Sequence, residues 1–123
     1  MSCAASAGAG ERGAATLIVL ALSGMLMFVG LALTGVAAIV LTQRSAQAAA
    51  DLAALAGASA AVAGADACAV AGDIAAANGA VLAQCEVSAT VVTIAVHLDG
   101  PRLADRRYGV TAQARAGPAD PSG

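Results

Sequence analysis

The chain has 123 residues, which is enough for one small domain but too few for two separate cores. Hydrophobic residues make up 59% and charged residues 11%, against roughly 45–50% and 25% in soluble domains. This composition excludes an intrinsically disordered chain. An aromatic content of 2% argues against a large enzyme core, and a net charge of −2 argues against nucleic acid as a partner.

Residues 14–42 form an almost wholly apolar segment without a charged side chain. A helix of about 20 residues crosses a hydrocarbon core of ~30 Å, whereas this segment would give a helix of about 43 Å. The sequence therefore predicts a transmembrane helix over 14–42 that is tilted or leaves the bilayer before it ends. The alternative is a signal cleaved near residues 45–48, which would release an exported soluble binding domain, although signal cores usually have about 7–15 apolar residues.

The orientation in the cell membrane depends on the residues that flank this segment. Arg12 and Arg44 lie on opposite sides, so the positive-inside rule gives nearly a tie. Two cysteines beyond the segment favour an extracytoplasmic C-terminal part. We therefore expect residues 1–13, with Cys3, to form a cytoplasmic leader of a single-pass protein that contacts membrane lipid.

Small residues recur on one face of the predicted transmembrane helix. Gly30, Thr34, Ala37 and Ala38 follow i, i+4, i+7, i+8 spacing, which lets a second helix approach closely in lipid. This face predicts packing against partner helices or a second copy of the chain. An alanine-rich sequence also produces such spacing by chance.

The helical pattern continues beyond the apolar segment. Residues 43–63 are rich in alanine and leucine and contain no proline, so they predict an extracytoplasmic extension of one helix that runs from about residue 14 to about residue 62. Leu52, Leu55 and Val62 form a thin apolar stripe on this extension.

Residues 64–116 are expected to form a small α+β cap. Gly64–Asp66 breaks the long helix, Asp66 is a suitable N-cap for a short second helix, and Asn78–Gly79 is a suitable stop for it. Residues 86–98 alternate, with Val92, Ile94, Val96 and Leu98 on one face, and predict a half-buried strand.

A second strand is predicted at residues 108–115, after a turn signal at Asp99–Pro101. Tyr108, Val110, Ala112 and Ala114 share one side of this strand. The predicted fold class is therefore α+β, with a long N-terminal transmembrane helix, a short helix and a C-terminal two-stranded antiparallel hairpin. Residues 117–123 are expected to be a disordered tail.

Cys68 lies early in the predicted short helix, and Cys85 lies just before the first predicted strand. Outside the cytoplasm a disulfide is the natural interpretation, and closing a loop of about 18 residues would contribute ~3 kcal/mol in the chain-entropy model. Free buried cysteines are the alternative. Three cysteines and one histidine without paired ligand spacing do not predict a metal site.

No catalytic set is visible in the sequence. His97 is the single histidine and lies within a predicted strand, and the acidic residues are scattered rather than paired. Arg102, Arg106 and Arg107 gather in the hairpin loop, which indicates a solvated loop or, alternatively, contact with an acidic partner or lipid headgroups. We expect a non-enzymatic protein without cofactor.

Two motifs resemble a known family. Residues 11–17 (ERGAATL), followed by a long apolar run, are similar to the start of TadE-like proteins, which are pseudopilin-like components of tight-adherence (Tad/Flp) pilus systems. Residues 44–58 resemble the stretch that follows the membrane helix in TadE/TadG-like proteins. The rest of the chain, with Cys68 and Cys85, looks like the small actinobacterial membrane branch, which also suits its lysine-free composition.

The resemblance implies a structural role in a pilus or secretion apparatus. In this family a prepilin peptidase cuts after a glycine, which would be Gly13 here, or alternatively Gly10. Pilin-like proteins usually carry a Glu five residues after the cut, and that position is Ile18. The expected function is therefore that of a TadE-like minor pseudopilin or a non-filament accessory, with other Tad membrane proteins as partners.

Overall fold

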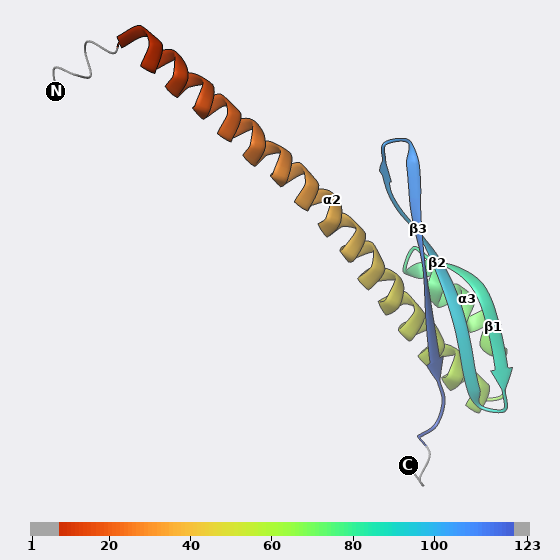
Figure 1. Cartoon of the computed structure of the whole chain (residues 1–123). Helices are drawn as coiled ribbons and strands as arrows, with labels where there is room; N and C mark the ends of the chain where they lie inside the picture. Colours follow the sequence, from red (N-terminus) through yellow and green to blue (C-terminus); the bar gives the residue numbers. More distant parts are fainter. Residues whose placement is uncertain (1–7, 120–123) are drawn as a thin grey trace. The chain divides into compact units, whose positions relative to one another are not determined.

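The computed structural model describes residues 8–119 (Figure 1). Two helices precede three strands along the chain. In order, the elements are α2 (Gly8–Val62), α3 (Ala67–Ala77), β1 (Val81–Ser88), β2 (Val91–Leu103) and β3 (Arg106–Ala116). The chain divides between Val36 and Ala37 into two compact units. The second unit, called the head below, contains the outer part of α2 with α3 and the sheet.

The long helix α2 ends where its sequence predicts. Gly64 adopts a left-handed conformation, with φ of 76°, directly after the last turn. Its N–H donates to the carbonyl of Ala61, and the N–H of Ala65 donates to the carbonyl of Ala60. These two bonds satisfy carbonyls that the end of the helix leaves without partners. The predicted end near residue 62 is confirmed.

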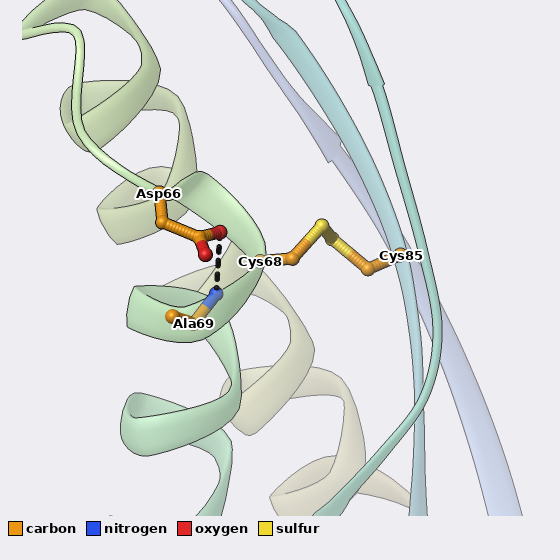
Figure 2. The surroundings of a disulfide bond; sticks show 4 residues. All are labelled: Asp66, Cys68, Ala69 and Cys85. Carbon is orange, nitrogen blue, oxygen red and sulfur yellow. Dashed lines mark hydrogen bonds between the residues drawn. A yellow bond between two sulfur atoms is a disulfide. The ribbon is translucent and has the colours of Figure 1, made fainter.

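The short helix α3 begins and ends at the predicted signals. The Asp66 carboxylate accepts a hydrogen bond from the backbone N–H of Ala69, at 3.1 Å (Figure 2). Asn78 is the C-cap, and its side-chain amide donates to the carbonyl of Ile74 at 2.8 Å. Gly79 follows with φ of 74°, so the chain turns directly into β1.

The sheet has three antiparallel strands in the order β1-β2-β3, so the prediction of a two-stranded hairpin is wrong. The predicted strand over 86–98 spans two strands and a tight turn. Ser88 pairs with Val91, and Ala89 at the turn has φ of 55°. This turn contains no Gly, Pro, Asn or Asp in its two central positions, so turn chemistry gave no signal for it.

The predicted turn at Asp99–Pro101 is also wrong, because β2 continues through it to Leu103. The register shifts between Asp99 and Arg102, where the longer strand accommodates an extra residue as a bulge. Pro101 has no N–H to donate, which explains the interrupted ladder at this point. The reversal occurs instead at Ala104 and Asp105, both with positive φ, as expected for a two-residue hairpin turn.

The core of the head lies between the outer part of α2, α3 and one face of the sheet. Val92, Ile94 and Val96 are the largest fully buried side chains. Almost every other buried side chain is an alanine, which allows the elements to approach closely. The core alanines of the two helices are Ala46, Ala49, Ala50, Ala53, Ala54, Ala58, Ala67, Ala71 and Ala75.

The alternation predicted for the strands is confirmed on the inner face. Val92, Ile94 and Val96 are buried, and Leu98 is half-buried against them. On β3, Val110, Ala112 and Ala114 belong to the same core, whereas Tyr108 is 45% exposed and lies outside it.

The apolar stripe predicted on the outer part of α2 does not face the core. Leu52, Leu55 and Val62 are 49%, 59% and 66% exposed. The alanines of the opposite face are buried instead. A Cβ added to Gly57 would lie 3.2 Å from the carbonyl oxygen of Ala67 and 3.3 Å from Val92 Cγ1. This close approach is available only to a helix face without bulky side chains.

Candidate functional site: the apolar helix and the disulfide-linked head

The apolar segment of α2 keeps its side chains outside any protein core. Large apolar residues such as Leu26, Phe28 and Leu31 are 65–74% exposed. The most apolar window of the helix has a mean hydropathy of 2.4 and none of it is buried. Among the described residues, α2 is the one helix long and apolar enough to cross a membrane. Such exposure is unfavourable in water and suits a lipid environment.

The small-residue face predicted on this helix lies partly in each unit. In the first unit, the hydroxyl of Thr34 donates to the carbonyl of Gly30 at 2.9 Å, so it is satisfied within the helix. Nothing lies within 4 Å of a Cβ added to Gly30. In the head, Ala37 is exposed and Ala38 is half-buried. The surface around Gly30 is therefore open to a neighbour.

The predicted processing site lies in the first turns of α2. Gly13 is exposed, and no atom approaches within 4 Å of the position its Cβ would occupy. Glu11 lies in the first turn of the helix, where a carboxylate interacts favourably with the helix dipole. Cys3 and most of the predicted leader lie outside the described residues.

Cys68 and Cys85 form a disulfide in the structure, with an S–S distance of 2.04 Å (Figure 2). Cys68 is the second residue of α3 and Cys85 lies within β1, so the bond joins the helix to the edge of the sheet. Both cysteines are half-buried. Because the core is made mainly of alanine, this bond supplies a constraint that bulky side chains would otherwise provide.

The outer face of the sheet is polar. His97 lies 3.5 Å from the Asp99 carboxylate and 3.3 Å from the hydroxyl of Thr111. A hollow of about 450 Å³ on this face is lined partly by Gln84, Glu86 and Gln113. Within residues 8–119, no group of three or more His, Cys, Asp or Glu side chains could hold a metal ion.

The predicted arginine cluster lies at the far end of the β2–β3 hairpin. β1 pairs with β2 only as far as His97, so residues beyond it form a two-stranded extension. Arg102, Arg106 and Arg107 are all exposed there. Sequence reasoning placed them in a loop, whereas the structure places them in the paired strands on either side of the Ala104–Asp105 turn.

Sequence reasoning missed two parts of this arrangement: strand β1 and the alanine face of α2. The pairing of Cys85 with Ile94 across the strands places the cysteine on the inner face. Leu82 and Cys85 both pack against the core, but they are three residues apart because the register is irregular between Leu82 and Gln84. This irregularity removed the period-two signal that would have revealed the strand.

Together these features define a small α+β head that continues directly from a helix apolar enough to span a membrane. Residues 13–60 match the family model described as Putative Flp pilus-assembly TadE/G-like, which confirms the resemblance found in the sequence. The match covers the apolar segment and the outer part of α2 and ends before α3. Comparison with curated proteins and with solved structures gave no match.

Proposed function

We propose that the chain is a single-pass membrane component of a Tad/Flp-type pilus or secretion apparatus, acting without catalysis as a TadE-like minor pseudopilin or accessory. The observation that carries this proposal is the TadE/G-like match over residues 13–60. The matched segment holds both the exposed apolar helix and the alanine face that supports the head. A helix of this kind serves as an anchor and an assembly surface at once.

The proposed topology has residues 1–13 in the cytoplasm, residues 14–42 in the membrane, and the rest of the head, from residue 43 onward, outside. The disulfide between Cys68 and Cys85 supports this orientation, because disulfides persist in oxidising compartments. Residues 43–63 then extend the helix beyond the bilayer and residues 64–116 form the cap. The head would present its surface to other Tad subunits.

The intact mass of the mature chain, isolated from membranes and from medium, tests processing and topology. A membrane-bound chain that lacks residues 1–13 and gains two hydrogens on reduction supports a processed pseudopilin with an extracytoplasmic head. A full-length, oxidised membrane chain supports the accessory role instead. A chain in the medium that begins near Gln47 contradicts membrane anchoring and supports an exported binding domain.

A second test addresses the helix face around Gly30. We expect Gly30→Leu to reduce co-purification with Tad membrane proteins or with a second copy, because leucine prevents the close approach of two helices. Gly24→Leu is the matched control, since Gly24 is equally open and lies on a different face. Equal co-purification of the two variants and the unmodified chain would contradict this role for Gly30.

A further inference from the structure

The end of the β2–β3 hairpin concentrates positive charge. Arg102, Arg106 and Arg107 account for three of the six basic residues of the chain. Arg102 lies directly opposite Arg107 in the register, an arrangement of like charges that disfavours strand pairing. Within residues 8–119, the one ion pair is between His97 and Asp99. None of the three guanidinium groups forms an ion pair in the described part of the chain, and from Arg102 to Arg107 they outnumber the single carboxylate, that of Asp105.

Within the head, the β2–β3 hairpin runs along α2 in the direction of Thr42. A Cβ on Gly57 would lie 3.3 Å from Val92 Cγ1, whereas a Cβ on Gly100 would lie 3.5 Å from Thr42 Cγ2. From Val92 to Gly100, β2 therefore passes from Gly57 back to Thr42 on α2. The two elements run antiparallel. The hairpin continues past Gly100 for three more residues, or roughly 10 Å at 3.3 Å per residue.

In the proposed topology, Thr42 and the hairpin end beside it lie at the outer surface of the membrane. Thr42 is the last residue of the apolar segment, and the segment is longer than the ~20 residues that a bilayer core requires. Its outer turns therefore lie among the lipid headgroups when the helix spans the membrane. Tyr108, which is 45% exposed at the base of the arginine cluster, has the amphipathic ring that favours this zone.

We propose that Arg102, Arg106 and Arg107 bind the phosphate groups of anionic phospholipids on the extracytoplasmic surface of the cell membrane. These contacts hold the head against that surface. This inference rests on the membrane anchoring proposed above. A guanidinium matches a phosphate with two parallel hydrogen bonds. Between Arg102 and Arg107 the hairpin end carries three arginines and one acidic residue, Asp105. The remaining acidic side chains of the described head would be repelled by the same surface, so charge orients the head with its hairpin end toward the lipid: Asp51, Asp66, Asp73, Glu86 and Asp99.

A single tryptophan tests this contact, because the chain contains none. The full-length Tyr108→Trp protein is reconstituted into phosphatidylcholine vesicles, with or without phosphatidylglycerol, that carry a headgroup-level nitroxide quencher. We expect stronger quenching with phosphatidylglycerol, and loss of that increase at high salt. Leu55→Trp, at the other end of the head, is the matched control and is expected to show little quenching in either lipid.

Replacing the three arginines by glutamine in the Tyr108→Trp protein is expected to weaken the phosphatidylglycerol-dependent contact by at least about tenfold. Arg115→Gln, which removes one exposed arginine far from the hairpin end, should leave it unchanged. Equal quenching in both lipids, or no quenching in either, overturns the proposal. In that case, co-purification of an acidic Tad protein that depends on the three arginines would identify a protein partner instead. Flotation of the chain with vesicles after alkaline extraction tests anchoring separately, so the two failures are distinguishable.

Discussion

The two halves of α2 use apolar residues in opposite ways. Before Val36 the helix exposes leucine, methionine, phenylalanine and valine, and none of its most apolar window is buried. Beyond Ala37 it exposes Leu52 and Leu55 and buries alanines. Hydropathy separates the two parts, since the outer part contains Arg44 and Asp51, but it does not reveal which face of the outer part is buried. Side-chain size does, because a face of alanine lets a sheet and a second helix approach closely, whereas bulky apolar side chains remain on the exposed surface.

The largest expected effect on the stability of the head comes from removing the disulfide that supplements its alanine core. We expect Cys68→Ala with Cys85→Ala to destabilise the head by about 3 kcal/mol in the chain-entropy model. Hydrogen exchange of β1–β3 in the full-length protein should then accelerate by about 100-fold, with the apolar helix unaffected. Cys3→Ala is the control. Unchanged exchange in the strands would show that alanine packing suffices for stability.

The alanine face can be challenged directly with two neighbouring residues. Ala53 is fully buried, so Ala53→Leu should destabilise the head by about 2 kcal/mol through overpacking. Leu52→Ala, one residue earlier on the exposed face, should cost less than about 0.5 kcal/mol. Both values can be measured by exchange of the strand amides. A larger effect at Leu52 than at Ala53 would reverse the assignment of the two faces.

The smallest effect concerns the start of α3. Asp66→Ala removes the carboxylate that accepts from Ala69 and is expected to cost about 1 kcal/mol. Asp73→Ala changes the same charge within the exposed middle of α3, where it has no capping role, and should cost less than about 0.5 kcal/mol. Equal exchange of α3 amides in the two variants would mean that charge, rather than the cap, governs this helix.

The helices were predictable because their ends carry specific chemistry. Asp66, Asn78 and Gly79 each satisfy a backbone requirement that few residue types meet. The sheet was predicted only in part. Ala89 adopts a positive φ that glycine or asparagine usually supplies, so the first hairpin turn was invisible and two strands were merged into one.

In the candidate site, too, some features have a local sequence signal and others depend on packing between distant segments. The apolar segment and the two cysteines are visible in the sequence, since each depends on composition or on a rare residue type. The burial of alanine on α2 and the extension of the β2–β3 hairpin depend on packing between distant segments. Pro101 gave a strong turn signal, yet it lies at a bulge within β2, because the neighbouring strand β3 determines where the chain can reverse.

The position of the disulfide has a consequence for how the head is made. Both cysteines precede β2, and the bond closes within a stretch of 17 residues. When a chain crosses a membrane with its head emerging in sequence order, Cys68 and Cys85 reach the far side before β2 and β3. The bond can therefore close on an incomplete domain, and the later strands add to a helix and strand whose pairing is already fixed.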